Sequence, residues 1–340
     1  MFFDFIKVDR WGTINNIYFM MDRLGSMELS KKIMILSIFF ILINYNDFEA
    51  KAFVADLYEE ELQNEGTIEL IDPITEQVVK TFVREDYKIE TQFEEYLNEI
   101  TAWVQQFAQG SETKAGYNKP IILDRIDQDG TIIKGKPRIV INEEELVDKI
   151  VERLFVGGKI QLPLLYIKSG YEEEDVPYLQ EVVLASYTTH FNGANTGRSK
   201  NIELSAIAIN NVIVGSGDIF SFNTTVGPRD VAAGYQEAPE IIRGKVVMGI
   251  GGGICQTSST LFNAIDQLDV KTIERHHHTK DVKYVPKGRD ATVSFGGLDY
   301  RFQNTTGIPL LIKSYYSRGS LTVQIKTSKE YAELYKELNN

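Results

Sequence analysis

The only cysteine of the 340-residue chain, Cys255, follows three consecutive glycines. The apolar residues that come next recur at helical spacing: Ile254, Leu261, Phe262, Ile265 and Leu268. We therefore expect Cys255 at the N-terminal end of a helix, where backbone N–H groups and the helix dipole favour a thiolate. A cysteine in that position could act as a nucleophile, with the amides that follow Gly253 forming an oxyanion hole.

Two other interpretations of this stretch remain open. A lone cysteine is often a small buried apolar residue without reactivity. A glycine-rich loop before a helix can also bind phosphate. However, the stretch lacks the Lys-Ser/Thr pair of a P-loop, and its glycine spacing differs from that of the dinucleotide-binding fingerprint.

Three of the four histidines are consecutive and lie downstream of the cysteine, in a segment expected to be a strand. His276 and His278 would then point to the same face of that strand. Because a thiolate nucleophile needs a general base, we predict His278 or His276 as the base for Cys255. Asp290 or Asp281 could orient the imidazole.

The same residues also permit a zinc site, because Cys255, His276 and His278 are of the types that zinc binds. No second cysteine or carboxylate cluster accompanies them. We therefore expect no metal and no organic cofactor.

Other polar residues near the cysteine could contact a substrate. Arg229 and Arg275 have guanidinium groups that could hold a carboxylate at two points. The remaining candidates for oxyanion or substrate contacts are Gly252, Gly253, Gln256 and Ser258.

The N-terminal part of the chain reads as an export signal. Lys31 and Lys32 precede an apolar run at 33–43, and an Ala-Lys-Ala site stands at 50–52. The run is shorter than the roughly 20 residues that cross a bilayer. We expect a signal peptide that starts at Met27, which N-terminal sequencing of the mature protein would test; the alternative is an uncleaved membrane anchor through 33–43. Both place the rest of the chain outside the cytoplasm.

Composition excludes some functions. The chain carries 36 basic and 48 acidic residues, a net charge of −12, so it lacks the basic surface expected of a nucleic-acid-binding protein. With one cysteine it forms no internal disulfide, and the thiol is a candidate for reactivity.

The patterning predicts an α+β protein. A helix is expected over 93–107, and Asn142 with Glu145 is expected to cap a second helix. The order of short strands and helices here resembles the peptidoglycan-binding-like domain found beside cell-wall transpeptidase domains. A hairpin, 309–316 paired with 321–326, closes a mixed-sheet domain that carries the Cys255 helix. The expected divisions are 1–52 (extension and signal or anchor), 53–178 (peptidoglycan-binding-like region), 184–327 (C-terminal domain) and 328–340 (tail).

Short motifs between residues 184 and 315 carry a second, more specific resemblance. They are Arg198…Asn201-Ile202, Phe220-Ser221-Phe222-Asn223, Val226-Gly227-Pro228-Arg229, Gly251-Gly252-Gly253-Ile254-Cys255-Gln256, Ser258-Ser259-Thr260-Leu261, Glu274-Arg275-His276-x-His278, Tyr284-Val285-Pro286-x-Gly288-x-Asp290-Ala291 and Asn304-x-Thr306. The stretch resembles the VanW domain, which is named for an accessory protein of some glycopeptide-resistance (vancomycin-resistance) clusters. His277 departs from the family pattern, and we assign it no role.

The resemblance implies an exported protein of the cell envelope whose partners are peptidoglycan stem peptides. Some VanW-domain proteins have been implicated as L,D-transpeptidases that make 3–3 cross-links through the cysteine of this motif. The competing hypothesis is a wall-binding accessory protein in which Cys255 is inert. A cysteine peptidase that cuts cross-links would share the nucleophile. Fast thiol labelling at neutral pH would favour an enzyme.

Overall fold

The computed structural model describes residues 67–83, 93–111, 114–154, 157–242 and 245–339. They divide into two compact units: the first holds the described residues up to Tyr117 and from Ile141 to Leu164, and the second holds Asn118–Val140 and the described residues from Leu165 onward. The expected signal or anchor at 33–43 lies outside the described residues. Within the described ranges, no helix is both long and apolar enough to span a bilayer. The α+β class expected from the sequence is confirmed.

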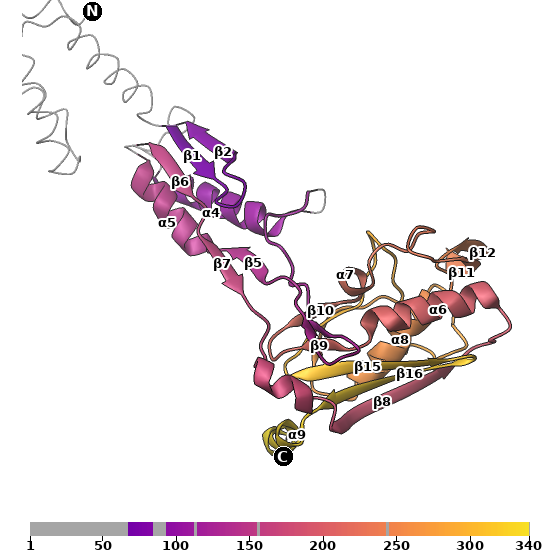
Figure 1. Ribbon diagram of the computed structural model, residues 1–340. Coiled ribbons are helices and arrows are strands. Elements are labelled where there is room, and N and C mark those ends of the chain that lie inside the picture. Colours follow the sequence, from indigo (N-terminus) through magenta and orange to yellow (C-terminus); the bar gives the residue numbers. More distant parts are fainter. Residues whose placement is uncertain (1–66, 84–92, 112–113, 155–156, 243–244, 340) are drawn as a thin grey trace, which may run out of the picture. The chain divides into compact units, whose positions relative to one another are not determined.

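The first unit is a small sheet covered by two helices (Figure 1). Its elements are β1 (Thr67–Ile71), β2 (Val78–Val83), α4 (Phe93–Gln109), α5 (Glu143–Arg153) and β6 (Gly158–Gln161). Strand β1 is central, antiparallel to β2 and parallel to β6. The predicted cap is present at α5, where the side chain of Asn142 accepts a hydrogen bond of 3.3 Å from the backbone N–H of Glu145.

The second unit contains most of the chain. Its elements are β3 (Arg125–Ile126), β4 (Ile132–Ile133), β5 (Arg138–Ile141), β7 (Leu164–Ile167), the 3₁₀ helix η3 (Glu173–Tyr178), β8 (Val182–His190), α6 (Thr196–Ile209), β9 (Val212–Val214), β10 (Ile219–Ser221), α7 (Phe222–Val226), β11 (Glu237–Ile242), β12 (Lys245–Ile250), α8 (Ile254–Ile265), β13 (Lys271–Glu274), β14 (Arg301–Gln303), β15 (Leu310–Ser317), β16 (Ser320–Thr327) and α9 (Lys329–Leu338). Strands β5 and β7 pair with each other, and the division between the two units falls within each of them.

The main sheet of the second unit is antiparallel and has six strands in the order β4-β3-β9-β15-β16-β8. Helix α8 packs on β8 and β16, and α6 packs on β15 and on α8 (Figure 1). A smaller sheet, β10-β14-β13, and the hairpin β11–β12 complete the unit. Strands β15 and β16 form the predicted C-terminal hairpin.

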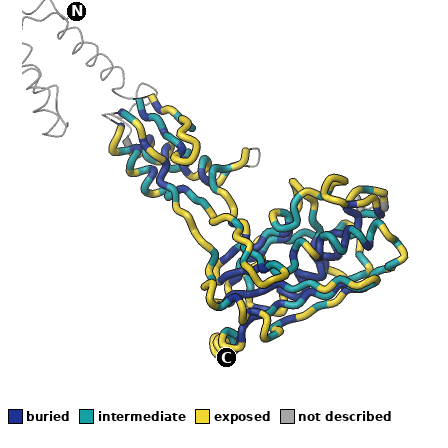
Figure 2. The backbone as a smooth tube through the Cα atoms, viewed as in Figure 1, coloured by how far each residue is buried: buried dark blue, intermediate teal, exposed yellow. Residues whose placement is uncertain are grey.

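Helix α8 lies in the centre of this unit. The apolar residues that predicted it, from Ile254 to Leu268, belong to the largest buried cluster. Its polar residues are buried too: Gln256, Thr257, Ser258, Ser259 and Thr260 each expose 0% of their surface. In Figure 2 the buried stretches of the second unit are concentrated around this helix and the strands beneath it. Every residue of α8 except Cys255 is therefore buried, and Cys255 is the partly exposed position of the helix.

The two units do not follow the expected domain division. Residues 118–140, expected in the first domain, group with the second unit because Arg125 of β3 pairs with Val212 of β9. Ile126 is buried there with Ile213. The expected C-terminal tail forms helix α9, which Ser328 caps by accepting a hydrogen bond from the N–H of Tyr331.

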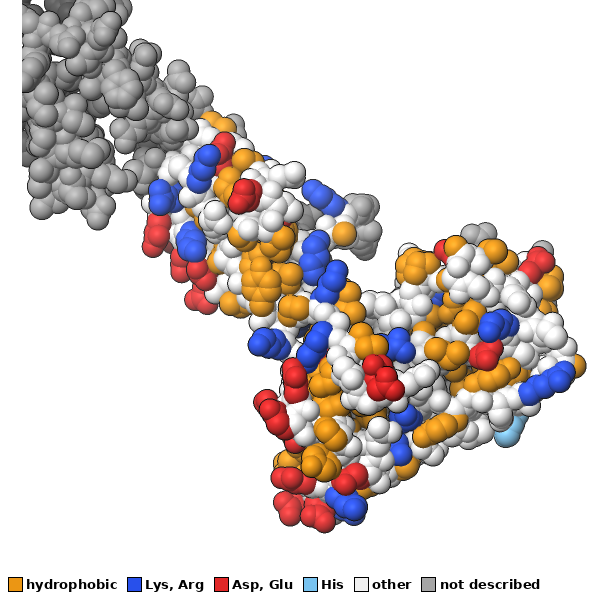
Figure 3. All heavy atoms as spheres, in the orientation of Figure 1, with side chains coloured by type: hydrophobic (Ala, Val, Ile, Leu, Met, Phe, Trp, Pro, Cys, Tyr) orange, Lys and Arg blue, Asp and Glu red, His pale blue; other side chains and the backbone are white. Residues whose placement is uncertain are grey.

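Acidic side chains gather at the end of the second unit where η3 and α9 lie (Figure 3). They come from Glu173, Glu174, Glu330, Glu333 and Glu337. This concentration accounts for part of the net negative charge of the chain.

Candidate active site

Cys255 is the second residue of α8, and only Ile254 separates it from the glycines. Gly251 has a φ of +92° and Gly253, the N-cap, a φ of +112°, a region that other residues rarely adopt. A side chain at Gly252 would collide with the carbonyl oxygen of Ala238, only 2.4 Å from the position of its Cβ. The glycines therefore allow the sharp turn that delivers Cys255 to the helix start.

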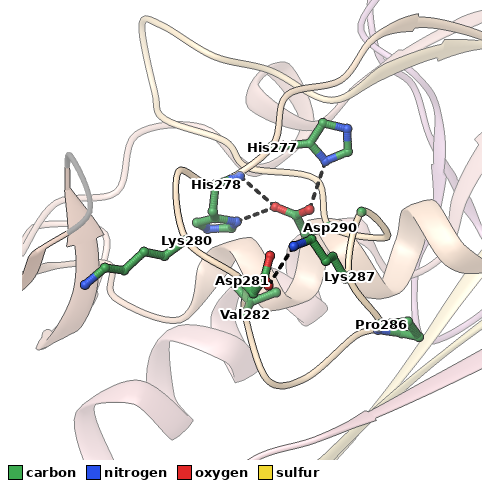
Figure 4. A pocket seen from close by; sticks show the side chains of 9 residues that line it. His277, His278, Lys280, Asp281, Val282, Pro286, Lys287 and Asp290 are labelled. Carbon is green, nitrogen blue, oxygen red and sulfur yellow. Dashed lines mark hydrogen bonds and ion pairs between the residues drawn. The ribbon is translucent and has the colours of Figure 1, made fainter.

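His278 and Asp290 form a tightly bound pair beside this helix. Asp290 Oδ2 lies 2.6 Å from the ring Nδ1 of His278 and 2.7 Å from its backbone nitrogen. Both side chains are nearly buried, with 8% and 9% of their surface exposed. Figure 4 shows both histidine rings, His277 and His278, directed at the Asp290 carboxylate.

His278 lies close enough to the Cys255 thiol to lower its pKa through a hydrogen bond and through its charge. Burial raises the pKa of the Cys255 thiol, but the hydrogen bond and the charge of His278 outweigh it and bring the pKa below its ordinary value. Since Nδ1 of His278 is bound to Asp290, Nε2 is the ring nitrogen left for the sulfur.

The pKa of His278 moves in the opposite direction. Burial lowers it, but the interactions with Cys255 and Asp290 raise it overall. For Asp290, burial raises the pKa, but the backbone N–H of His278 and the two histidine rings bring it to about 2. This arrangement favours a thiolate–imidazolium pair supported by an ionised carboxylate.

A segment just after Asp290 also touches the thiol. The Cys255 sulfur lies 3.7 Å from Thr292 Oγ1 and 3.5 Å from the carbonyl oxygen of Val293. Cys255 remains partly exposed. Sequence reasoning missed Thr292 and Val293, because their contact with the sulfur depends on the path of this irregular segment.

The other predicted base and orienting residues lie elsewhere. His276 Nε2 lies 3.0 Å from Glu274 Oε1. Asp281 is an exposed partner of Lys287. The expected strand, β13, ends at Glu274, so the histidines do not alternate between two faces as predicted. The structure therefore brings His278 and Asp290 to Cys255, and not His276 or Asp281.

Gln256 does not face the sulfur, contrary to our expectation for an oxyanion donor. Its Nε2 donates to Thr189 Oγ1 at 3.0 Å and to the carbonyl of His190 at 3.1 Å. Its Oε1 accepts from Nη2 of Arg198 at 2.9 Å. With every polar atom of this amide engaged in the interior, Gln256 anchors α8 to the sheet.

Ser258 is also a structural residue. Its hydroxyl donates to the carbonyl oxygen of Ala291 at 2.6 Å and is fully buried. Ser259, one residue on, accepts a hydrogen bond of 2.9 Å from the N–H of Ala291. These contacts bind the segment after Asp290 to α8, which fixes the distance between the carboxylate and the helix.

The two arginines predicted to bind carboxylates, Arg275 and Arg229, differ in how their guanidinium groups are paired. Arg275 lies over the ring of Phe262, 4.1 Å from its centroid, and donates to the carbonyl of Gly288 at 3.2 Å, so it holds the chain that leads to Asp290. Arg229 donates through Nη1 to Asn223 Oδ1 at 2.7 Å. Its Nε and Nη2 are buried and have no hydrogen-bond partner.

Two further residues near the thiol were not predicted as site residues. Arg198, which binds Gln256, lies 5.9 Å from the ring centroid of Tyr284. Burial raises the pKa of Tyr284, and the negative charge of a Cys255 thiolate raises it further, so this phenol stays protonated. Arg198 was visible only as part of a sequence motif, and no pattern identified Tyr284 as a neighbour of the thiol.

A pocket of about 220 Å³ adjoins the His278–Asp290 pair (Figure 4). Its walls are His277, His278, Lys280, Asp281, Val282, Pro286, Lys287, Gly288 and Asp290. Cys255 is not part of these walls, so the pocket borders the His278–Asp290 pair and not the thiol. Within the described ranges, no three His, Cys, Asp or Glu side chains are grouped so as to hold a metal ion.

This chain is similar to known proteins, and the matched family region lies in the unit that carries the site. Residues 197–326 match the family described as VanW like protein. The uncharacterized protein YoaR of Bacillus subtilis (strain 168) is 40% identical over 214 residues, which cover 62% of this chain and 70% of YoaR. The chain belongs to the VanW-like family.

A second relative of this VanW-like protein is the vancomycin B-type resistance protein VanW of Enterococcus faecalis (strain ATCC 700802 / V583). It is 29% identical over 178 residues, which cover 49% of this chain and 64% of the relative. Among solved structures, none matches this chain.

Proposed function

We propose that this VanW-like protein is an exported cysteine L,D-transpeptidase that forms 3–3 cross-links between peptidoglycan stem peptides. The observation that carries the proposal is the contact of Cys255 with His278, whose ring is held by Asp290. A nucleophile, a base and an orienting carboxylate are the groups that acyl transfer through a thioester requires.

In the first step, the Cys255 thiolate attacks the carbonyl carbon of the amide between the third residue of a tetrapeptide stem and its terminal D-alanine. The C–N bond breaks, and His278 donates its proton from Nε2 to the departing amine. The products are a thioester on Cys255 and free D-alanine. Asp290 keeps the imidazole in place and stabilises its charge.

In the second step, the side-chain amine of the third residue of a neighbouring stem attacks the thioester. Neutral His278 takes the proton from that amine, and the C–S bond breaks to restore the thiolate. The new amide is the 3–3 cross-link. If water takes the place of the amine, the same site acts as an L,D-carboxypeptidase.

The negative oxygen that develops during both steps needs hydrogen-bond donors. Gln256 is excluded from this role by its internal contacts. The backbone N–H of Cys255 belongs to the first turn of α8, where amides have no partner within the helix. We assign the oxyanion to this amide and to the positive end of the α8 dipole.

Location and partners form part of the proposal. The apolar run at 33–43 is of the type that directs export, so the site would face the cell wall. The first unit would bind peptidoglycan. The name of the E. faecalis relative, a vancomycin B-type resistance protein, fits a role in the cell envelope.

The test is mass spectrometry of the purified protein incubated with tetrapeptide muropeptides, beside Cys255→Ala. We expect an adduct on the wild type that lacks the mass of D-alanine, with 3–3 dimers and released D-alanine, and none of these with the variant. Absence of adduct and product, with Cys255 also unreactive to alkylation, would instead support a non-catalytic peptidoglycan-binding accessory protein.

A further inference from the structure

We propose that Arg229 binds the terminal carboxylate of the donor peptide, so that Cys255 acts only on the amide bond before the last residue of a chain. This inference rests on the proposed function and specifies its substrate class. It predicts action on a bond that precedes a single free C-terminal residue and exclusion of bonds inside a longer peptide or an existing cross-link.

The first observation is an incompletely paired guanidinium in the protein interior. Among the described residues, a hydrogen-bond partner is present for one of the three nitrogens of Arg229, Nη1, which donates to Asn223 Oδ1 at 2.7 Å. Nε and Nη2 are buried and unpaired. Native proteins pair nearly all such groups, so each exception calls for an explanation such as a missing ligand.

The unpaired nitrogens are the two that match a carboxylate. In a guanidinium the N–H of Nε and one N–H of Nη2 are parallel and point the same way. A carboxylate accepts both at once, in the two-point geometry typical of arginine. The contact with Asn223 on the other side of the group fixes the orientation of this edge.

The protein itself does not supply the missing carboxylate. Asp299 is close enough to influence the charge of Arg229, but its oxygens are already engaged. Its Oδ2 accepts from the hydroxyl of Ser221 at 2.6 Å, and its Oδ1 accepts from the backbone N–H groups of Asn223 and Tyr300, each at 2.8 Å. None of the ion pairs formed within the described residues includes Arg229.

Arg229 also packs against the turn that leads into Cys255. Its Cβ is 3.2 Å from the position that a Cβ of Gly251 would occupy, in the turn that leads into Cys255. Its guanidinium lies 5.6 Å from the ring of Phe295, two residues after Val293, whose carbonyl contacts the Cys255 sulfur. The guanidinium and the thiol thus share one short segment of chain as a neighbour.

This placement suits a carboxylate one residue beyond the scissile bond, because consecutive residues are only about 3.8 Å apart. The ring of Phe295, which is 54% exposed, lies 5.6 Å from the guanidinium, so the proposal requires this ring to move when the ligand enters. A peptide that continues past this residue has an amide in place of the carboxylate and cannot neutralise the buried charge.

The experiment measures binding and acylation separately, with the full chain. The probes are a synthetic tetrapeptide stem with a free C-terminal carboxylate, the same peptide with a C-terminal carboxamide, and a pentapeptide stem. Calorimetry with Cys255→Ala should show that the free acid binds about tenfold or more tightly than the other two peptides. The second measurement is the rate of thioester formation by the wild-type cysteine.

Variants of two arginines test whether Arg229 causes the preference for the free acid. In the Cys255→Ala background, Arg229→Gln and Arg229→Lys should bind the acid and the carboxamide equally or nearly so. Arg138→Gln, which removes an exposed arginine of β5, should keep the full preference. Near-ultraviolet circular dichroism shows whether the variants remain folded. The comparison of the acid with the carboxamide does not depend on the folding of an arginine variant, because it is also made with Arg229 in place.

The outcomes separate the two proposals. Any of three results would overturn the carboxylate site. These are equal binding of the acid and the carboxamide, no binding of the acid, and a preference for the acid that survives in folded Arg229→Gln. Thioester formation at equal rates from both tetrapeptides would leave the transpeptidase standing and overturn the role of Arg229. A preference for the acid that depends on Arg229, without any thioester, would leave the carboxylate site standing and count against the transpeptidase.

Discussion

One oxygen of Asp290 accepts two hydrogen bonds from the same residue, His278. Oδ2 binds the ring Nδ1–H at 2.6 Å and the backbone N–H at 2.7 Å. The carboxylate thereby fixes both the position of the chain at His278 and the rotation of its ring. Of the two ring nitrogens, only Nε2 is left to exchange a proton with Cys255.

Replacing Asp290 with asparagine should therefore remove most of the activity. An amide has a similar shape but does not stabilise the imidazolium, and its NH₂ group can force the ring into the wrong tautomer. We expect Asp290→Asn to slow thioester formation by between about 10² and 10⁴-fold. Asp281→Asn is the matched control and should be as active as the wild type, since Asp281 pairs only with Lys287 at the surface.

The lowered pKa of Cys255 should be visible in alkylation. The rate of reaction with iodoacetamide follows the thiolate, so it should remain high below the ordinary thiol pKa of about 8.5 and fall only as the pH drops through the lowered pKa of Cys255.

His278→Ala removes the largest influences that lower the pKa of Cys255, so the pKa of the thiol should rise. Labelling of this variant at pH 7 should be about tenfold slower or more. His276→Ala should label like the wild type, because His276 contacts Glu274. Equal rates for the two histidine variants would contradict the assigned contact.

Gln256 should contribute to stability more than to the chemistry of the site. Gln256→Ala leaves the side chain of Arg198 and the carbonyl of His190 without their partner in the interior. We expect urea unfolding to show a loss of about 1–3 kcal/mol in the free energy of unfolding. Gln303→Ala, which removes one exposed hydrogen bond to Gly217, should change it by less than about 1 kcal/mol. Unchanged stability of Gln256→Ala, combined with slow acylation, would restore it as an oxyanion donor.

The turn before Cys255 should tolerate no side chain. Gly253→Ala combines a φ of +112° with a new Cβ only 2.9 Å from Cγ of Arg198. Gly296→Ala has a φ of +76° with no atom within 4 Å of the new Cβ. Thermal unfolding should show a loss of about 1–2 kcal/mol for Gly296→Ala and a larger loss for Gly253→Ala. A similar loss for both would mean that the contact with Arg198 is easily relieved.

The elements nearest Cys255 were predictable because their sequence signals are local. The apolar spacing after Cys255 predicted α8, and two alternating runs around a turn predicted β15 and β16. Asn142, as a capping residue, predicted the start of α5. In each case the residues that form the element also carry its pattern.

Relations between distant residues were not predictable in the same way. The choice of His278 over His276 depends on where β13 ends, which is set by pairing with β14 and not by the histidines themselves. Gln256 was assigned to the wrong environment because α8 is buried on every side, so the sequence does not show which polar residue faces the sulfur. Residues 118–140 were placed in the wrong unit because their partners, such as Val212, lie far along the chain.

The interleaved path of the backbone limits how this protein can be divided. The chain crosses between its two units after Tyr117, Val140 and Leu164. A fragment that begins at residue 184 would keep Cys255, His278 and Asp290 but lose β3, and with it the strand that pairs with β9. The unpaired edge of β9 would then be free to form hydrogen bonds with the same edge of another molecule. Expression of the site-bearing unit by simple truncation should therefore yield aggregates, whereas joining 118–140 directly to residue 165 keeps the edge covered.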